Sequence, residues 1–490
     1  MPPPTAPEPA PASPGRDGTG SHRLLLGAAL TLVVLGQVMV LSASAVGEIA
    51  RGNSPYALAA EQARFAVLGV AVMLAASRVP LRVHRRAAAP LLLGALALQL
   101  LVFTPLGLSQ GERRSWVALG PVAGQPAELL KVGLVLWLAR VLAERQDGIH
   151  DWRTAALPAV PGAVVVVAAT LAGHDVGTSL VLAALVATAL FVAGAPLRLF
   201  AVGGAGVVLA FLAVAASAPR RVQRISDWLG GDCDPLGSCY QTTQGVRALA
   251  SGGWLGVGLG QSRQKWSYLP EAHNDFIFAI VGEELGLAGT LLVLALLGAL
   301  ALAMIRVIGR HPDPFARIAT GGVLGWVVSQ ALVNIGTVIG LAPVIGVPLP
   351  LVSAGGSALV ATMLALGVVL ACARGPGAGA RRRGRGQPPT PAARTANACR
   401  RSCTAQYDVA AGGVPPSRTA VADPTAASTA ARYGREPVLT RRTPSSPSRA
   451  SVSPGTSRTF TGRSIAAVSA AMSAGSVAPG TKIPSAPASA

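Results

Sequence analysis

Long apolar segments alternate with short polar ones from about residue 24 to residue 373. Counting uninterrupted apolar stretches of about 17 or more residues, close to the length that crosses a bilayer as a helix, gives ten candidate spans. They lie near residues 24–45, 63–80, 88–108, 126–144, 157–173, 177–195, 198–217, 276–306, 317–342 and 351–373. Backbone that crosses a bilayer must satisfy its own hydrogen bonds, so each span is expected to be helical. The pattern predicts an all-α polytopic membrane protein of about ten transmembrane helices, with a large loop between the seventh and the eighth.

Composition supports this prediction and excludes an ordinary soluble domain. Of 490 residues, 51% are hydrophobic and 13% are charged, and the mean hydropathy is +0.51. The net charge of +20 does not indicate nucleic acid, because the Lys and Arg residues fall in short loops and in a tail. Residues 1–22 lack an obvious cleavage site and do not resemble a signal peptide. We therefore expect a membrane partner, no nucleic acid, and a membrane domain at residues 23–373.

The basic residues of the loops predict the orientation of the chain. Basic residues expected in loops on one side are Arg82, Arg85, Arg86, Arg145, Arg153, Arg310, Arg374, Arg381, Arg382 and Arg383. Such residues mark cytoplasmic loops, so both termini are expected in the cytoplasm. Residues 1–22 and the basic tail at 374–490, poor in large apolar residues, are expected to be disordered there.

Residues 218–275 then form a large extracytoplasmic loop. It nevertheless contains six basic residues: Arg220, Arg221, Arg224, Arg247, Arg263 and Lys265. Basic residues retained on the outer face suggest an anionic ligand. Cys233 and Cys239 face an oxidising compartment and are close enough in sequence to form a local disulfide. The glycines between Gly252 and Gly260 match no nucleotide-binding fingerprint, so no nucleotide is expected.

Charged residues also occur at the edges of the apolar spans. Glu128 and Lys131 are three residues apart on one face of the fourth span, where they form either a structural ion pair or part of a functional cavity. Just upstream, Arg113 and Arg114 can bind phosphate through their guanidinium groups. Trp116 is either an interfacial anchor or part of the same site.

Asp275 stands at the start of the eighth span, on the predicted outer face. The helix dipole would stabilise its charge and burial would raise its pKa, and the simplest alternative is a helix N-cap without chemistry. The prolines and glycines of residues 343–357 interrupt apolar sequence and predict a broken backbone at membrane depth. Ser353 and Ser357 either line a cavity there or satisfy freed carbonyl groups.

Five of these motifs resemble the SEDS family of cell-wall proteins, which comprises FtsW, RodA and SpoVE. The matching pieces are ERRSW at 112–116, QPAELLK at 125–131, HDVGTSLVL at 174–182, and residues 248–286 and 334–357. The family's HTDF reads HNDF here, and its SYGGS reads SAGGS. The Gly before its Arg-Trp element is displaced by one position, to Gly111, which leaves Arg113 and Arg114 as alternatives. The large-loop motif looks most like division-type FtsW of actinobacterial character.

The resemblance implies a peptidoglycan glycosyltransferase that polymerises lipid II and works with a class B penicillin-binding protein and other divisome proteins. Asp275 corresponds to the family's essential acid and is the candidate general base. The implied substrate-binding residues are Arg113, Trp116, Glu128, Lys131, Arg247, Arg263, Lys265, His273, Ser353 and Ser357. A divalent cation, Mg²⁺ or Mn²⁺, is a candidate cofactor.

Three alternatives to a division-type polymerase stay open. A RodA-like polymerase would serve elongation rather than septation. The intramembrane Glu128 and Lys131 also suit a lipid II flippase, although a transporter tends to contain internal repeats and none is visible here. A non-catalytic scaffold would use the basic tail to recruit cytoplasmic partners.

Overall fold

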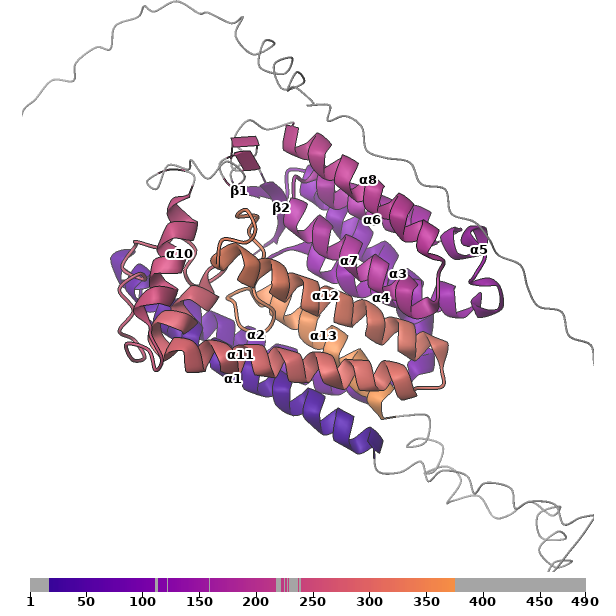
Figure 1. Ribbon diagram of the computed structural model, residues 1–490, viewed down its shortest axis with the longest axis horizontal. Helices are drawn as coiled ribbons and strands as arrows, with labels where there is room; N and C mark the ends of the chain where they lie inside the picture. Colours follow the sequence, from indigo (N-terminus) through magenta and orange to yellow (C-terminus); the bar gives the residue numbers. More distant parts are fainter. Residues whose placement is uncertain are drawn as a thin grey trace, which may run out of the picture. The chain divides into compact units, whose positions relative to one another are not determined.

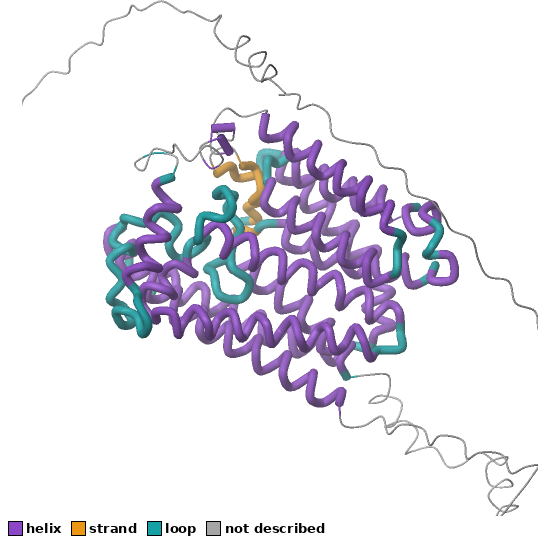
Figure 2. The backbone as a smooth tube through the Cα atoms, viewed as in Figure 1, coloured by secondary structure: helices purple, strands orange, loops and turns teal. Residues whose placement is uncertain are grey.

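The computed structural model describes residues 17–374, with gaps at 111–112, 121, 158, 217–221, 224, 227, 229–236 and 238. These residues belong to one unit of the chain and form a bundle of long helices (Figures 1 and 2). The main helices are α1 (Asp17–Ala50), α2 (Ala57–Arg78), α3 (Leu81–Leu100), α4 (Pro126–Ala143), α6 (Ala159–Ala172), α7 (Val176–Ala193), α8 (Leu197–Ala216), α10 (Tyr240–Ser251), α11 (Ile277–Arg310), α12 (Pro314–Val338) and α13 (Gly356–Ala373). Short helical turns are η1 (Leu101–Phe103), η2 (Gln146–Gly148) and α5 (Trp152–Ala156).

Ten of the helices correspond to the ten predicted spans. Nine helical segments among the described residues are long and apolar enough to cross a membrane, one of them joining α5 to α6. The tenth is α4, an 18-residue helix that carries Glu128, Lys131 and Arg140 and packs inside the bundle against α3, α7 and α12. The polytopic helical fold predicted from hydropathy is confirmed. The predicted tail at 374–490 lies outside the described residues except for Arg374.

The start of α3 differs from the prediction. We expected Arg82, Arg85 and Arg86 in a loop, but α3 begins at Leu81 and contains all three. Long basic side chains can project from a helix end towards water. Arg85 donates to both carboxylate oxygens of Asp313 at 2.9 Å, and its guanidinium lies 4.9 Å from the centre of the Phe315 ring. These contacts allow the helix to begin before the apolar run does.

Loops predicted to be cytoplasmic meet at one end of the bundle, which we call the basic end. Arg374 donates to the carbonyl of Ser77 at 3.0 Å and lies 3.1 Å from a ring nitrogen of His22. The Arg85–Asp313 ion pair joins the start of α3 to the turn between α11 and α12. The start of α3, the turn between α11 and α12 and both ends of the described chain therefore lie on one side, as predicted for these segments.

A small antiparallel sheet, which the hydropathy pattern did not predict, replaces the end of the third span. Strands β1 (Gly107–Gln110), β2 (Arg113–Leu119) and β3 (Val122–Gly124) lie in the order β1-β2-β3. The Arg114 amide donates to the Gly173 carbonyl at 2.9 Å, which ties β2 to the turn between α6 and α7. Figure 1 shows the sheet at the end of the bundle away from α5. This end carries the site described below.

Helix α11 is broken at Gly286, where φ is 66° and ψ is −162°. Residues 276–284 before the break are buried, whereas several leucines after it are exposed. The amides of Leu287 and Ala288 donate to the carbonyls of Gly253 and Trp254 at 2.9 and 3.1 Å. A Cβ on Gly286 would overlap the amide nitrogen of Gly256. Residues 253 and 254, in the loop after α10, thus accept hydrogen bonds from two amides that follow the break. Only glycine at position 286 allows the two backbones to approach this closely.

Residues 339–355, which we call the strap, connect α12 to α13 without regular structure. Gln330 donates to the Pro348 carbonyl at 2.9 Å, and Asn334 donates to the Val347 carbonyl at 2.7 Å. These residues lie on one face of α12 because they are four positions apart. The broken backbone predicted from the prolines is confirmed, and α12 holds it in place. As a result α12 ends before the predicted residue 342 and α13 begins after the predicted residue 351.

Candidate active site

Asp275 and Arg113 meet at Gly346 of the strap. Arg113 extends from β2 and donates to the carbonyls of Ile345 and Gly346, the latter at 3.3 Å. A Cβ on Gly346 would lie 2.7 Å from two guanidinium nitrogens of Arg113 and 3.0 Å from Asp275 Oδ2. Gly346 has φ of +65° and leaves room for both groups. The fold therefore brings together a carboxylate and a guanidinium that are 162 positions apart in sequence.

This geometry favours Arg113 over Arg114, the two alternatives that the sequence left open. The guanidinium of Arg113 reaches the strap beside Asp275, whereas the side chain of Arg114 is exposed. Trp116 lies two positions further along β2, opposite Leu108, and is half-buried. The sheet thus positions Arg113 for the site.

The backbone around Asp275 is fixed by three hydrogen bonds to consecutive carbonyl groups. Ala354 N donates to the carbonyl of His273 at 3.0 Å. Ser353 Oγ donates to that of Asn274 at 2.7 Å. Asn334 Nδ2 donates to that of Asp275, also at 2.7 Å. We call this arrangement the carbonyl clamp, and it holds the peptide on either side of the candidate base.

Ser353 therefore satisfies freed backbone groups, one of the two roles predicted for it. Besides donating to Asn274, its hydroxyl accepts from Leu349 N at 2.7 Å inside the strap. Gln62 of α2 supports the same turn, because it donates to the Ser353 carbonyl at 3.3 Å and accepts from Gly355 N at 3.1 Å. We did not single out Gln62 from the sequence. Gln62 lies between Glu61 and Arg64, just before the predicted span 63–80, so the sequence gives no sign that its amide is buried.

Asp275 is not an N-cap of α11. Phe276 occupies the cap position, and no side chain there forms a capping hydrogen bond. Burial raises the pKa of Asp275 to about 6, while Arg113 opposes this effect and Glu271 and Asp175 add to it. At neutral pH the carboxylate is thus mostly ionised and still basic enough to accept a proton. Burial also lowers the pKa of the neighbouring His273, with nearby Glu271 opposing.

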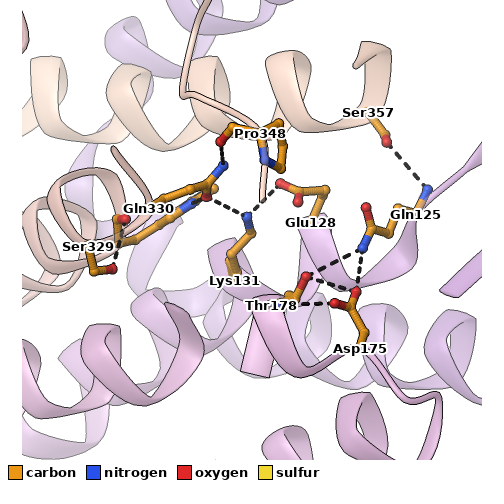
Figure 3. Close-up of polar contacts among 10 residues, drawn as sticks. Gln125, Glu128, Lys131, Asp175, Thr178, Ser329, Gln330, Pro348 and Ser357 are labelled. Carbon is orange, nitrogen blue, oxygen red and sulfur yellow. Dashed lines mark hydrogen bonds and ion pairs between the residues drawn. The ribbon is translucent and has the colours of Figure 1, made fainter. Parts of the chain in front are cut away.

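Glu128 and Lys131 form a buried ion pair inside the bundle, shown in Figure 3. The Lys131 ammonium lies 2.8 Å from Glu128 Oε2, donates to Gln330 Oε1 at 3.1 Å and lies 4.5 Å from the centre of the Trp326 ring. Both charged side chains are 2% exposed. Because Gln330 also binds the Pro348 carbonyl, the pair is linked to the strap by two hydrogen bonds. The structural interpretation of this pair is supported.

A second polar group joins α4, α7 and α13. The side-chain Nε2 of Gln125 donates to Asp175 Oδ2 at 2.7 Å, and the backbone N of Gln125 donates to Ser357 Oγ at 3.3 Å (Figure 3). Asp175 caps α7 by accepting from Thr178 N at 3.2 Å. The turn at His174 and Asp175 is thus hydrogen-bonded, and Ser357 binds backbone.

Lys265 is buried outside the group formed by Asp275, Arg113 and Gly346, which we call the Asp275 cluster. Its ammonium lies 3.3 Å from Glu284 Oε1 and donates to the Gly260 carbonyl at 2.6 Å. Ser42 of α1 also donates to Glu284 at 2.6 Å. We expected Lys265 to bind an anionic substrate, but these contacts are better explained by a structural role. The expectation differs from the structure because Lys265 is buried next to Glu284. The sequence spacing of the two residues did not reveal this contact.

The other outer basic residues are placed differently from Lys265. Arg247 and Arg263 have exposed side chains, although the Arg263 amide donates to Glu283 Oε1 at 2.9 Å. Glu283 and Glu284 thus anchor the loop that contains Ser262, Arg263 and Lys265. Arg220, Arg221 and Arg224 lie outside the described residues. Cys239 is disulfide-bonded, and Cys233, its predicted partner, also lies outside them.

Comparison with known proteins identifies the family. A family model described as cell cycle protein, covering FtsW, RodA and SpoVE, matches residues 22–375. The chain belongs to this SEDS family. It is 39% identical over 361 residues to the probable peptidoglycan glycosyltransferase FtsW of Mycobacterium tuberculosis, covering 74% of this chain and 69% of that protein. It is 36% identical to stage V sporulation protein E of Bacillus subtilis, covering 73% of this chain and 98% of that protein.

Solved structures of SEDS proteins share the fold. One belongs to a study of the structural coordination of polymerization and crosslinking by a peptidoglycan synthase complex, with a TM-score of 0.60 and 31% identity over 71% of this chain and 96% of that one. The rod shape determining protein RodA of Thermus thermophilus has a TM-score of 0.52 and 29% identity, over 71% and 95%. The described helices and their order are therefore those of a SEDS membrane domain.

Proposed function

We propose that this SEDS protein is a peptidoglycan glycosyltransferase that polymerises lipid II during septal wall synthesis, with Asp275 as the general base. The observation that carries the proposal is the Asp275 carboxylate beside the Arg113 guanidinium at Gly346. Glycan transfer from a lipid diphosphate needs a base for the acceptor hydroxyl and positive charge for the leaving diphosphate. The names of the FtsW relatives support the same reaction and favour the septal over the RodA-like elongation role.

The depth of the site in the membrane suits a lipid-linked substrate. About 20 helical residues cross the hydrocarbon core of a bilayer. Counting about 20 residues from Arg23, Arg306 and Arg374 at the basic end leads to Ala43 in α1, Gly286 in α11 and Ala354 before α13. These levels agree with one another, because Ser42 binds Glu284, next to the first two positions.

Asp275 belongs to the same level, since Ala354 N donates to the carbonyl of His273, two residues before it. The diphosphate of a lipid-linked sugar lies at the headgroup level, directly beyond the hydrocarbon core. The orientation that follows from the basic residues puts this level at the outer surface and both termini in the cytoplasm.

The chemistry assigned to the chain's own groups is a proton transfer and a charge stabilisation. Asp275, ionised at neutral pH, accepts the proton of the acceptor sugar hydroxyl as that oxygen attacks the anomeric carbon of the donor. The bond from the donor sugar to its diphosphate breaks, and the lipid diphosphate leaves. Arg113 uses two strap carbonyls to fix its guanidinium and retains donors for the diphosphate. Arg247 and Arg263 are exposed candidates for the same anion.

A divalent cation, Mg²⁺ or Mn²⁺, stays part of the proposal. The described residues contain no group of three His, Cys, Asp or Glu side chains that could hold a metal ion. Asp275 and the diphosphate oxygens of the substrate would then be its ligands, because hard cations prefer oxygen. When bound, the ion would supply further positive charge to the leaving group.

The partner proposed for this polymerase is a class B penicillin-binding protein within the divisome. Support comes from the structurally similar protein described above, which belongs to a peptidoglycan synthase complex that coordinates polymerization and crosslinking. The flippase alternative rested mainly on Glu128 and Lys131. It is weakened because this pair is buried and its lysine contacts Gln330 and Trp326. Scrambling of lipid II that depends on Glu128 without any polymerisation would restore it.

The test is glycan-strand formation from lipid II by the purified full-length chain, assayed with its partner transpeptidase. We expect Asp275→Asn to lower the rate by about two to four orders of magnitude, as for the loss of a general base. Glu271→Gln is the matched control, because Glu271 is an exposed carboxylate of the same loop. Polymerisation by Asp275→Asn at the parent rate would show that the base is another residue.

A further inference from the structure

The outer loop, residues 253–268, presents an unusual set of large exposed side chains. Trp254, Leu255, Val257, Leu259, Trp266 and Tyr268 are 78%, 83%, 44%, 55%, 62% and 57% exposed. Single apolar residues on a surface need no explanation, but six large exposed side chains within one 16-residue loop point to an interaction site. None of these side chains takes part in the Asp275 cluster described above.

The outer loop is held in one conformation. The amides of Val257 and Gly258 donate to the carbonyls of Glu283 and Glu284 at 3.0 and 3.1 Å. Ser262 and Lys265, within the loop, bind the carboxylates of the same two glutamates. The exposed side chains are therefore fixed in position by buried polar contacts beneath them, as in a preformed binding surface.

The loop joins α11 where the lipid-facing surface of that helix begins. The Trp254 carbonyl accepts from the amide of Ala288, just after the break at Gly286. Beyond this point Leu287, Leu291 and Leu292 are 41%, 53% and 48% exposed, as expected for a surface that faces lipid. The apolar side chains of the loop thus continue a surface that already faces the bilayer, at its outer boundary.

The charge of the loop also fits this level. Residues 251–270 contain no Asp or Glu. The ammonium of Lys265 is neutralised by Glu284, whereas the guanidinium of Arg263 is exposed, as is that of Arg247 on the adjacent α10. Trp, Tyr and Arg together are typical of the membrane interface, where aromatic rings lie at headgroup level and Arg meets phosphate.

We propose that the outer loop is embedded in the outer leaflet of the membrane. Trp254, Leu255 and Trp266 enter the boundary between headgroups and acyl chains. This places the exposed Arg263 and Arg247, the candidates for the substrate's diphosphate, at the level of the lipid phosphate groups. This surface differs from the Asp275 site, and it does not require the proposed catalytic function. The loop leads through residues 269–274 directly to Asp275, so its insertion would fix the height of that carboxylate relative to the lipid phosphates.

The test is quenching of tryptophan fluorescence in the full-length chain reconstituted in nanodiscs. The signal of one residue is the difference between wild type and Trp254→Phe or Trp266→Phe. We expect phospholipid brominated near the top of its acyl chains to lower both difference signals by about twofold or more, and aqueous iodide to leave them nearly unchanged. The signal of Trp326, which is 0% exposed inside the bundle, should respond to neither quencher.

Two results would overturn the proposal. Iodide quenching of Trp254 and Trp266 without quenching by brominated lipid would place the loop in water. Iodide protection that develops only after a partner protein is added would make the loop a protein-docking surface instead.

Discussion

Asp275 is a carboxyl group whose protonation should control the rate. Its pKa is raised to about 6 by burial, and only the ionised form can act as a base. The rate should therefore fall as the pH drops through about 6. Arg113 lowers this pKa, so Arg113→Gln should move the midpoint to higher pH. Glu271 raises it, so Glu271→Gln should move the midpoint to lower pH. The measurement is kcat/KM for lipid II between pH 5 and about pH 8.

The two variants check each other in this pH series. Arg113→Gln should also lower the maximal rate if the guanidinium binds the diphosphate, but the midpoint does not depend on that amplitude. Midpoints that moved in the same direction for both variants would contradict the assignment of the acidic limb to Asp275.

Asp275 should also cost the protein stability at neutral pH. Since its folded pKa lies above the usual value of 3.8, the folded state binds more protons than the unfolded state between about pH 4 and 6. Stability contributed by the protonated form is thus lost as the pH rises through about 6. Asp275→Asn should raise the free energy of unfolding at pH 7 by up to roughly 3 kcal/mol. A higher thermal midpoint in an inactive variant would separate lost chemistry from lost folding, and a lower one would contradict this account.

Gly346 leaves space for the Asp275 carboxylate and the Arg113 guanidinium to approach each other. Gly346→Ala would place a Cβ 2.7 Å from the Arg113 guanidinium and 3.0 Å from Asp275 Oδ2. We expect a loss of activity of at least about tenfold, as small displacements in an active site cause. Gly340→Ala is the matched control, because Gly340 also has positive φ, at +80°, but its Cβ would first meet Thr242 at 3.4 Å. Equal activities at equal stability would contradict the importance of this space.

Among the elements, α12 connects the buried ion pair, the strap and the carbonyl clamp. Asn334→Leu would remove two donors and leave the buried carbonyls of Asp275 and Val347 without this partner. Each unsatisfied group costs about 1–3 kcal/mol, so the thermal midpoint and kcat should both fall. Ser329→Ala is the control on the same helix, because that hydroxyl binds only the Trp326 carbonyl within it. Unchanged kcat in Asn334→Leu would show that the clamp does not position Asp275.

The membrane-spanning helices were predictable because the bilayer constrains every residue that crosses it. The bilayer requires apolar runs of helical length, and these gave the ten helices directly. The prolines from Pro343 to Pro350 disclosed the strap for a local reason, since they remove amide donors. The break at Gly286 and the sheet at 107–124 have no such signal. Glycine inside an apolar helix is common, and the break becomes necessary only because the outer loop packs against α11 there.

The candidate site was predictable in part for the same reasons. The spacing of Glu128 and Lys131 on one helix predicted their pairing, which the structure contains. The contact of Arg113 with the strap, and the burial of Lys265 against Glu284, join residues that are far apart in sequence. Local sequence patterns do not show that Lys265 is buried in an ion pair whereas Arg113 reaches the strap. That difference depends on how α1, α11 and the sheet pack.

The whole molecule has an asymmetry of charge that predicts its direction in the membrane. Exposed arginines gather at the basic end, and the Asp275 cluster lies about 20 helical residues away. The loop between α1 and α2 should thus face the outside and the turn between α11 and α12 the cytoplasm. A cysteine at exposed Ser54 should react with a membrane-impermeant maleimide in intact cells. A cysteine at exposed Gly309 should react only after permeabilisation, with labelling above the wild-type background. The reverse pattern would place Asp275 on the cytoplasmic side, where the proposed reaction does not occur.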